Sequence, residues 1–288
     1  MFDVSGIWIP LLTPFRAGAV DRPALARLVR HLAQQDVAGF VACGSTGEAA
    51  MLSPDEQDTV LATTLDAAGG LPVMMGVSGV QPQAVVQRSA ELAERHPRVA
   101  AFLVSPPAYV KPPQSGIAHF YTRVADASPR PLVVYDIPSR TGVRIQPLTL
   151  LALAAHPNIM AVKDCSGDRA AAESLLADGR LGLLCGNDDE LFDQLARGAA
   201  GGIVASAHVA TDRFVALHAH LQAGRMAEAR LAWRTLAPLT QALFAEPNPA
   251  PLKGVLARTL GLANELREPM HPARASTIDA ALALLADG

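Results

Sequence analysis

The chain has 288 residues, 50% of them hydrophobic and 18% charged, with a formal net charge of -3. This composition excludes a disordered, collagenous or disulfide-rich scaffold and indicates a globular chain with one large core or two modest ones. Because no run of basic residues accompanies the negative charge, we expect a small molecule as the partner, with neither nucleic acid nor a membrane surface.

The cysteines and the first residues favour a cytoplasmic protein. The 3 cysteines form no C-x-x-C pair, which is typical of a reducing compartment. The N-terminal residues lack the basic region of a signal peptide, and no apolar run reaches the ~18 residues of a membrane span. Nearly all basic residues are arginines, and the lysines are limited to Lys111, Lys163 and Lys253. A lysine at a functional position is therefore conspicuous in this chain.

Short apolar runs alternate along the chain with longer stretches of helical periodicity, as in strands that are covered on both faces. Eight such runs occur: Ile7–Leu12, Gly39–Cys43, Val73–Val77, Ala100–Val104, Leu132–Tyr135, Ile159–Lys163, Leu181–Cys185 and Gly202–Ala205. Asp21 is placed to cap a first helix, in which the apolar residues from Leu25 to Leu32 share one face. Ser53-Pro54-Asp55-Glu56 predicts the capping box of a second helix.

Further helices are predicted after the later runs. Their ranges are Pro82–Arg95, Gln114–Ala127, Gln146–Ala155, Arg169–Ala177 and Asp189–Arg197. Eight strands that alternate with helices predict an α/β fold, a (β/α)8 TIM barrel. The competing doubly wound sheet usually carries G-x-G-x-x-G after its first strand, and this chain has Thr13-Pro14-Phe15 there. From Asp212 onward only helices are predicted, so we expect a catalytic barrel over residues 1–222 and a C-terminal helical subdomain over residues 223–288.

Two strand ends carry side chains suited to amine chemistry, because the C-terminal ends of barrel strands form the active site. The sixth run ends in Lys163, and we expect burial to lower the pKa of its ammonium group and yield an amine nucleophile. A lysine that extends its ammonium group to solvent, or pairs with Asp164 or another acidic residue, is the alternative. The fifth run ends in Tyr135, whose hydroxyl can either relay protons or be a satisfied group of the core.

The second run leads into the sequence Gly44-Ser45-Thr46-Gly47-Glu48. Its glycines let backbone amides approach a ligand, and its two hydroxyls can bind a carboxylate or pass a proton, although such a turn also forms for conformational reasons alone. A metal site is not expected, because the 8 histidines are scattered without H-x-x-x-H spacing. The cysteines lie near strand ends, where small buried apolar side chains are the simpler interpretation.

These motifs, in this order, resemble over nearly the whole chain the pyruvate-dependent class I aldolases typified by dihydrodipicolinate synthase and N-acetylneuraminate lyase. The matching segments are G-S-T-G-E at Gly44–Glu48, Y-D-I-P-S-R-T-G at Tyr135–Gly142, V-K-D-x-S-G-D at Val162–Asp168 and E-P-N-P-A-P-L-K at Glu246–Lys253. The resemblance implies that Lys163 forms a Schiff base with pyruvate and that the resulting enamine attacks an aldehyde. It implies no cofactor beyond this covalent link to the substrate.

The resemblance also assigns the other catalytic residues. Tyr135 resembles the residue that stabilises the imine and moves protons. Ser45 takes the place of a threonine in the same hydroxyl relay and keeps the hydroxyl, while losing the methyl group that restricts its rotamer. Tyr109 corresponds to a tyrosine that completes the relay in a neighbouring subunit. This assignment requires at least a dimer, and a homotetramer built as a dimer of dimers is expected.

The substrate-binding residues implied by the resemblance begin with the pyruvate pocket. Thr46 and the amide of Gly47 resemble the groups that hold the pyruvate carboxylate, and Gly186 with the carbonyl of Ile203 resembles the rest of the pocket. Arg140 corresponds to the arginine with which the synthases hold the carboxylate of aspartate semialdehyde, a group that a planar guanidinium fits. A surface ion pair is the alternative for Arg140.

The leading interpretation is a 4-hydroxy-tetrahydrodipicolinate synthase-type lyase of amino-acid biosynthesis that condenses pyruvate with L-aspartate semialdehyde. The first alternative is an aldolase, lyase or dehydratase of the same family that acts on another 2-oxo acid, such as N-acetylneuraminate, a 2-keto-3-deoxy sugar acid or a hydroxyproline derivative. The second is a non-catalytic ligand-binding member. Apolar residues stand at positions such as Ala49, Val80 and Ala108, where lysine-inhibited synthases place polar groups, so weak or absent inhibition by lysine is expected.

Overall fold

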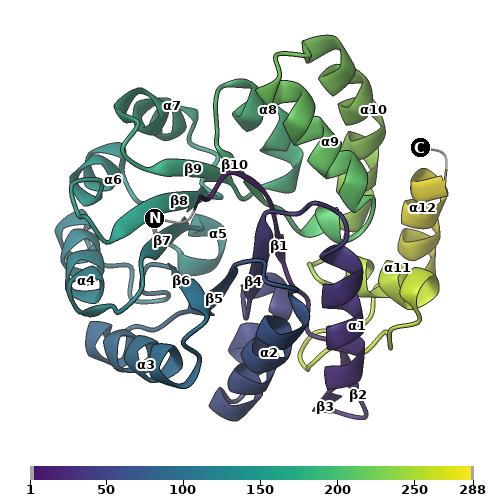
Figure 1. The fold of residues 1–288 in the computed structure, drawn as a ribbon, viewed down its shortest axis with the longest axis horizontal. Helices are drawn as coiled ribbons and strands as arrows, with labels where there is room; N and C mark the ends of the chain where they lie inside the picture. Colours follow the sequence, from purple (N-terminus) through teal and green to yellow (C-terminus); the bar gives the residue numbers. More distant parts are fainter. Residues whose placement is uncertain (1–2, 287–288) are drawn as a thin grey trace. The chain divides into compact units, whose positions relative to one another are not determined.

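A computed structural model describes residues 3–286, and its parallel strands form a closed barrel in the order β1-β10-β9-β8-β7-β6-β5-β4 (Figure 1). The barrel strands are β1 (Gly6–Pro10), β4 (Gly39–Ala42), β5 (Val73–Val77), β6 (Val99–Val104), β7 (Leu132–Asp136), β8 (Ile159–Asp164), β9 (Gly182–Cys185) and β10 (Gly201–Ile203). Every predicted apolar run overlaps one of these strands. The predicted (β/α)8 barrel is therefore confirmed.

Helices separate and follow the strands. They are α1 (Arg22–Leu32), α2 (Pro54–Ala67), α3 (Pro82–Arg95), α4 (Gln114–Ala127), α5 (Pro138–Thr141), α6 (Pro147–Leu153), α7 (Arg169–Asp178), α8 (Leu191–Ala196), α9 (Thr211–Gln222), α10 (Met226–Leu243), α11 (Ala250–Leu260) and α12 (Ala275–Ala286). None of the described helices combines the length and the apolar character that a membrane span needs.

The predicted helix caps are present. The Asp21 side chain accepts a hydrogen bond from the amide of Ala24 at 3.0 Å, and α1 buries its apolar face. At the start of α2 the Ser53 hydroxyl accepts from the Glu56 amide at 3.2 Å, and the Glu56 carboxylate accepts from the Ser53 amide at 2.9 Å. These bonds satisfy amide groups that the first turn of a helix leaves unpaired. Because the partners lie within three residues of each other, the caps can be predicted from a short stretch of sequence.

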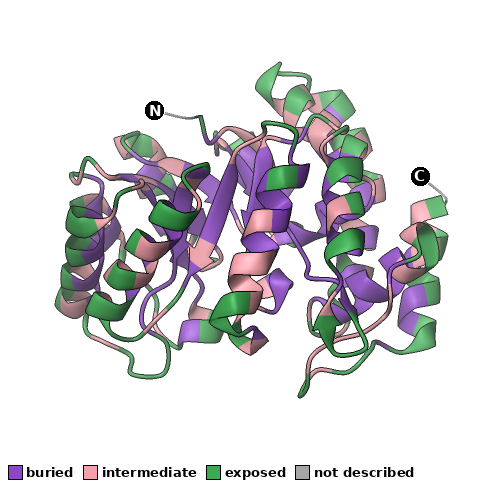
Figure 2. Cartoon of the chain, turned by 60° about the horizontal axis from the view of Figure 1, so that its bottom comes forward, coloured by how far each residue is buried: buried purple, intermediate pink, exposed green. Residues whose placement is uncertain are grey.

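The chain divides into two compact units, of which the first contains residues 3–5 and Pro72–Ile203. Its strands β5 to β10 pair in parallel with their neighbours, and Tyr135 of β7 lies in register with Lys163 of β8. Helices α3, α4, α6 and α7 lie outside these strands (Figure 1). The strands are almost entirely buried, whereas the helices have exposed outer faces (Figure 2). The ends of β7 and β8 hold the predicted tyrosine and lysine.

The second unit contains residues 6–71 and 204–286. Strands β1 and β4 pair in parallel, helix α1 packs against α2, and helix α9 packs against α10 and β1. The tail helices α11 and α12 pack on each other and belong to this unit. The predicted division of the chain after residue 222 falls at the end of α9 and stays a prediction.

Two short elements were not predicted. Phe15–Arg16 (β2) and Ala19–Val20 (β3) form an antiparallel hairpin after β1. Its turn holds Ala17 and Gly18 at positive φ, and the Glu265 carboxylate accepts hydrogen bonds from both of their amides. The other element is the four-residue helix α5, which ends at Gly142 with a φ of 75°. The hairpin depends on a distant partner and α5 on a tight turn. Neither produces the extended hydrophobic periodicity from which a strand or helix is predicted.

Candidate active site

The centre of the candidate site in the first unit is the pair of Lys163 and Tyr135. Lys163 is 6% exposed and Tyr135 is 7% exposed, although both stand near the ends of their strands. The Lys163 Nζ atom lies 4.3 Å from the centroid of the Tyr135 ring. The register of β7 and β8 causes this proximity, because residues in register on adjacent parallel strands are neighbours. The alternative pairing of Lys163 with Asp164 is not seen among the described ion pairs, and Asp164 accepts instead from Ser166 and Gln194.

The electrostatic environment of Lys163 differs from the expectation. Burial lowers the pKa of its ammonium group, as predicted, but the interaction with Tyr135 opposes this and the net pKa lies above the usual value. The expected lowering is therefore wrong, because the sequence could not show which polar groups face the lysine. The surroundings of Lys163 therefore favour its ammonium form. The lysine must transfer a proton before its nitrogen can attack a carbonyl.

Gly186 follows β9 and packs directly against the lysine. A Cβ atom added there would collide with Cys165 Sγ and would lie 3.0 Å from both Lys163 Cε and the Asp164 carbonyl oxygen. Burial raises the pKa of the Cys165 thiol to about 12, so this thiol is neutral at physiological pH. Cys165 is thus a neighbour of Lys163, and its neutral thiol is unsuited to act as a nucleophile. Ile203, the last predicted residue of this unit, ends β10.

The Arg140 segment follows Tyr135 on helix α5. The side chain of Arg140 is exposed, and no hydrogen bond or ion pair of its guanidinium occurs within residues 3–286. The predicted alternative, a surface ion pair, is therefore not formed here. The next residue, Thr141, accepts a backbone hydrogen bond from Tyr109 at 3.3 Å, and the Tyr109 side chain is 93% exposed at a φ of 71°. The end of α5, which carries Arg140, is thus joined to the Tyr109 segment by a backbone hydrogen bond.

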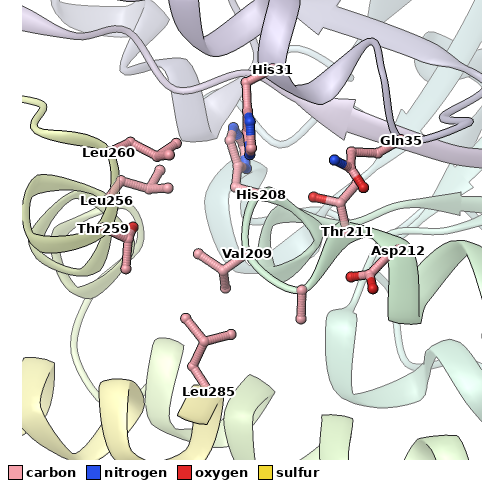
Figure 3. A pocket seen from close by; sticks show the side chains of 11 residues that line it. His31, Gln35, His208, Val209, Thr211, Asp212, Leu256, Thr259, Leu260 and Leu285 are labelled. Carbon is pink, nitrogen blue, oxygen red and sulfur yellow. The ribbon is translucent and has the colours of Figure 1, made fainter.

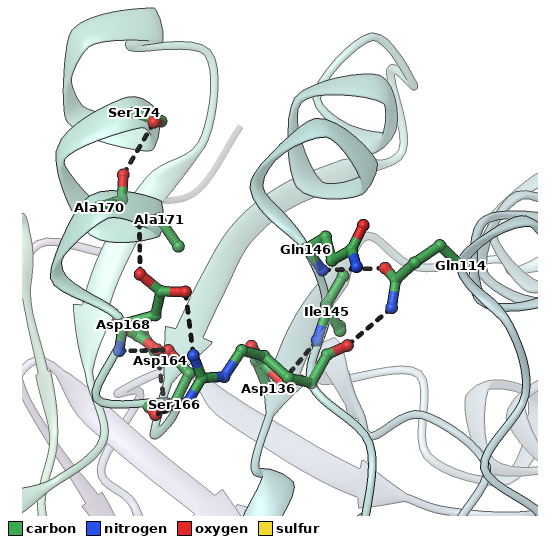
Figure 4. Close-up of polar contacts among 11 residues, drawn as sticks. Gln114, Asp136, Ile145, Gln146, Asp164, Ser166, Asp168, Ala170, Ala171 and Ser174 are labelled. Carbon is green, nitrogen blue, oxygen red and sulfur yellow. Dashed lines mark hydrogen bonds and ion pairs between the residues drawn. The ribbon is translucent and has the colours of Figure 1, made fainter.

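A hydrogen-bond network that was not predicted from the sequence joins the start of α4 to the segments that follow α5 and β8 (Figure 4). Gln114 donates to the Arg144 carbonyl at 2.8 Å and accepts from the Gln146 amide at 2.9 Å. The Arg144 guanidinium pairs with Asp168 at 3.1 Å, and Asp168 also caps α7. Ser166 donates to Asp164 at 2.6 Å. The only sequence signal for this network was the matching of Ser166 and Asp168 to the V-K-D-x-S-G-D segment.

Asp136 is a buried carboxyl group next to Tyr135. It is 1% exposed, and burial raises its pKa to about 7, although a hydrogen bond from the Ile145 amide at 3.3 Å opposes this. The neighbouring carboxylate of Asp164, in register on β8, raises the pKa further. Asp136 is therefore partly protonated near neutral pH, unlike an ordinary aspartate.

The candidate site residues of the second unit follow β4. Ser45, Thr46 and Gly47 form a turn of 3-10 helix, and the side chain of Thr46 is buried. The Gly47 amide donates to the Gly44 carbonyl at 3.0 Å within this turn, so it is not free for the carboxylate predicted to bind there. The amides of Ser45 and Thr46, which begin the turn, have no acceptor in the described part of the chain. These two amides are available to an anion without loss of a hydrogen bond, and the predicted role of the Gly47 amide stays a prediction.

Gly47 has a steric role in the same turn. A Cβ atom added at Gly47 would lie 2.8 Å from the Leu11 carbonyl oxygen, and the Thr13 hydroxyl donates to the Gly47 carbonyl at 2.7 Å. The glycine therefore lets the turn pack against the end of β1. This close approach is the physical reason for a glycine at a position where the amide itself is occupied.

The E-P-N-P segment of the tail reaches this turn. Asn248 donates from its side-chain amide to the Thr46 hydroxyl oxygen at 2.9 Å. Lys253, 1% exposed, forms a buried ion pair with Glu48, and its Nζ also donates to the Glu265 carbonyl at 2.8 Å. Burial lowers the pKa of Lys253 to about 8 against the effect of Glu48. Neither the contact of Asn248 with Thr46 nor that of Lys253 with Glu48 was predicted, because residues about 200 positions apart form no local sequence pattern.

A pocket of about 350 Å³ in the second unit contains none of the predicted site residues (Figure 3). It is lined by residues of α1, α9, α11 and α12, with His31 and His208 side by side. His208 accepts a hydrogen bond from the Leu12 amide at 3.2 Å and its second nitrogen contacts the Ala205 carbonyl at 2.8 Å, so it is a structural residue. Over the described residues, no group of three or more histidine, cysteine or acidic side chains could hold a metal ion.

Comparison with known proteins bears on the whole chain. A model described as the dihydrodipicolinate synthetase family matches residues 3–286. A 4-hydroxy-tetrahydrodipicolinate synthase of Stenotrophomonas maltophilia is 37% identical over 283 residues, covering 95% of this chain and 93% of that protein.

Solved structures give the same result. The dihydrodipicolinate synthase of Thermotoga maritima has a TM-score of 0.94 at 29% identity, covering 100% of this chain and 99% of that one. The chloride-inhibited synthase of Acinetobacter baumannii, solved with pyruvate, has a TM-score of 0.93 at 28% identity, covering 99% of this chain and 98% of that one. The predicted resemblance is therefore confirmed, and the chain belongs to the dihydrodipicolinate synthetase family of lyases.

Proposed function

We propose that the protein is a 4-hydroxy-tetrahydrodipicolinate synthase, which condenses pyruvate with L-aspartate semialdehyde through a Schiff base on Lys163. The observation that carries this proposal is the buried Lys163 at the end of β8, packed against Tyr135 and Gly186. The names of the curated relatives support the choice of reaction.

The covalent step requires an unprotonated lysine. Lys163 transfers a proton to the relay that begins at Tyr135, and its nitrogen then adds to the ketone carbon of pyruvate. Loss of water from the adduct gives an iminium ion, and loss of a proton from the methyl carbon gives an enamine. The enamine carbon attacks the aldehyde carbon, whose oxygen takes up a proton as the new carbon-carbon bond forms and the iminium ion is restored. The amino group of the semialdehyde then adds to the iminium carbon and closes the ring, and cleavage of the bond from this carbon to Lys163 releases the free lysine. No cofactor enters these steps, since the iminium group itself accepts the electron pair.

The proton relay is proposed to contain Tyr135, Ser45 and the Tyr109 of a neighbouring subunit. Two observations support it. The Ser45 hydroxyl has no partner in the described chain and is free to exchange a proton. The Tyr109 ring is 93% exposed, which is unusual for a large aromatic side chain unless another molecule covers it.

Substrate binding is proposed to use a second set of groups. The Thr46 hydroxyl and the amides of Ser45 and Thr46 hold the pyruvate carboxylate, with Gly186 and the Ile203 carbonyl completing the pocket. The free guanidinium of Arg140 binds the carboxylate of the semialdehyde. Arg140 is the reason for favouring this aldehyde over a sugar acid, because an exposed arginine without a protein partner is available to a second carboxylate.

Reductive trapping tests the covalent step. The protein is incubated with pyruvate, reduced with borohydride and digested, and the modified peptide is located by mass spectrometry. The proposal expects pyruvate on Lys163, and none in a Lys163→Arg variant, since a guanidinium forms no such imine. Absence of an adduct on Lys163 in the wild-type protein would exclude every aldolase function, including action on another 2-oxo acid, and leave the non-catalytic ligand-binding alternative.

Substrate choice is tested by turnover. With the semialdehyde, Arg140→Ala should lower kcat/KM by roughly 100-fold or more, because a charge-assisted pair to the carboxylate is lost, while pyruvate trapping stays near wild type. The exposed Arg258 at the end of α11 gives a matched control variant, Arg258→Ala. Full activity of Arg140→Ala on the semialdehyde, or faster cleavage of sugar acids by the wild type, would contradict the proposed substrate. Either result would favour the alternative of a lyase that acts on another 2-oxo acid.

The proposal also covers the compartment, the pathway and the assembly of the enzyme. We place it in the cytoplasm, in lysine biosynthesis, as a homotetramer built from a dimer of dimers. The three free cysteines within the described chain agree with a reducing compartment. Sedimentation velocity checks the assembly, and a monomer at working concentration would contradict it. Inhibition by lysine is expected to be weak or absent, and a steady-state titration of the pure enzyme with lysine measures it.

A further inference from the structure

The Thr46 hydroxyl has one donor hydrogen and two acceptor positions, so its direction decides what it offers to a substrate. In the second unit Asn248 donates to the Thr46 oxygen at 2.9 Å and occupies one acceptor position. No acceptor for the Thr46 hydrogen occurs among the described residues, and the side chain is 5% exposed. The hydrogen is therefore left for a ligand.

The loop that carries Thr46 is anchored at the two residues that follow it, Gly47 and Glu48. Thr13 donates to the Gly47 carbonyl at 2.7 Å, and the Glu48 carboxylate accepts from the Arg267 amide at 2.9 Å beside its ion pair with Lys253. Because the backbone is fixed by these contacts, the remaining freedom of Thr46 lies in its side-chain hydroxyl. Asn248 is the one described group that contacts this hydroxyl.

We propose that Asn248 is a positioning residue. By donating to Thr46 Oγ1, Asn248 directs the Thr46 hydrogen toward the carboxylate of the 2-oxo acid substrate. This inference rests on the proposed function, in which Thr46 binds that carboxylate. The tail segment thus acts on the reaction through Thr46 without contacting the substrate.

The direction of the hydrogen bond makes a distinctive prediction. In Asn248→Asp the new carboxylate accepts the Thr46 hydrogen and withdraws it from the substrate, and it adds a negative charge near the bound anion. In Asn248→Ala the donor is lost but the hydrogen stays available. The concentration of pyruvate that gives half-maximal trapping on Lys163 should therefore rise about 30-fold or more in Asn248→Asp and about threefold in Asn248→Ala.

Two controls separate this role from a structural one. Gln241→Glu adds the same charge at an exposed site on α10, seven residues away in sequence, and should leave half-saturation unchanged. In a Thr46→Val background, Asn248→Ala should add no further change, because its effect passes through the hydroxyl. Thermal unfolding of each variant shows whether the fold is retained, and pyruvate in excess should restore full trapping in every variant.

The outcomes are separable from those of the proposed function. If trapping on Lys163 fails in the wild-type protein at saturating pyruvate, the proposed function fails. If trapping succeeds but Asn248→Asp and Asn248→Ala raise the half-saturation concentration equally, the inference about hydrogen direction is wrong. If Asn248→Ala retains its effect in the Thr46→Val background, Asn248 acts on the substrate directly and the positioning role is also overturned.

Discussion

Gly186 determines how much space surrounds the reacting lysine. Gly186→Ala would place a methyl group against Cys165 Sγ and 3.0 Å from Lys163 Cε. Overpacking of this kind costs about 1–3 kcal/mol, and here it displaces the side chain that must reach the ketone carbon. We expect trapping of pyruvate by Gly186→Ala to slow by at least tenfold, as measured by the rate of adduct formation under borohydride.

A second substitution tests the steric cause. Cys165→Ala removes the sulfur that the new methyl group meets, so the Gly186→Ala, Cys165→Ala double variant should recover part of the trapping rate. Recovery should be partial, because the Asp164 carbonyl and Lys163 Cε stay close to the added methyl group. A double variant as slow as Gly186→Ala, with unchanged unfolding, would show that the sulfur is not the obstacle.

Asp136 predicts a pH dependence of stability. Its pKa in the folded protein is raised to about 7 from the ordinary value of 3.8. Between these values the folded state binds a proton that the unfolded state has lost, so the free energy of unfolding falls as pH rises through this range and levels off above it. In Asp136→Asn this fall should disappear, and the variant should be more stable than wild type at pH 8 by as much as a few kcal/mol.

Chemical denaturation at pH 5 and pH 8 measures the effect. The neutral amide can still accept the hydrogen bond from Ile145, which keeps the comparison local. The exposed Asp279→Asn change, at a residue paired with an arginine and not with a histidine, provides a matched control. An Asp136→Asn variant that loses as much stability as wild type between these two pH values would contradict the raised pKa.

At the scale of elements, the ion pair of Lys253 and Glu48 joins helix α11 to the loop that follows β4. Both side chains are almost fully buried, and the Lys253 ammonium also lies 4.1 Å from the centre of the Phe15 ring. Removing one partner of a buried pair leaves the other charge without compensation, which costs roughly 3–5 kcal/mol. We expect Lys253→Met to lose stability on this scale in a denaturant titration.

The double variant Lys253→Met, Glu48→Gln tests whether the cost comes from the unpaired charge. Because it buries no charge, its stability should lie closer to wild type than that of Lys253→Met. Arg258→Met, an exposed change on the same helix, should be nearly neutral. Equal destabilisation in the single and double variants would mean that packing, and not charge, dominates at Lys253.

Elements with an internal sequence pattern could be predicted from the sequence, and elements that depend on distant partners could not. The strands β5 and β7 are continuous apolar runs, because both of their faces are covered, and their predicted bounds agree with the structure to within a residue. The hairpin of β2 and β3 is held by Glu265, more than 200 residues away, and had no such pattern.

The candidate site divides in the same way. The positions of Lys163 and Tyr135 follow from the rule that barrel chemistry lies at strand ends, and their register brings them together. The net pKa shift of Lys163 depends on which groups face it in space, and the expected lowering was wrong for that reason. The hydrogen bond of the Gly47 amide to Gly44 was likewise not predicted, and the role of Gly47 in binding stays a prediction. The partners Asn248 and Lys253 were likewise visible only in the fold.

At the scale of the whole molecule, Tyr109 raises the question of whether one subunit completes the site of another. Its ring is 93% exposed, and Val110 beside it is 53% exposed. Two adjacent apolar side chains on one loop are costly in water unless another surface covers them. Complementation between inactive subunits can decide this, because a residue acting across an interface can be supplied by a different chain from the one that holds the lysine.

The test mixes Lys163→Ala with Tyr109→Phe after reversible dissociation. Each variant alone should have lost at least tenfold in kcat. In a hybrid dimer the Tyr109→Phe subunit keeps its lysine and receives an intact tyrosine from the Lys163→Ala subunit. Random pairing at equal amounts makes half of the dimers hybrid with one good site each, so activity should return to roughly a quarter of wild type. If Tyr109 acts within its own chain, every site lacks one group, and mixing restores nothing.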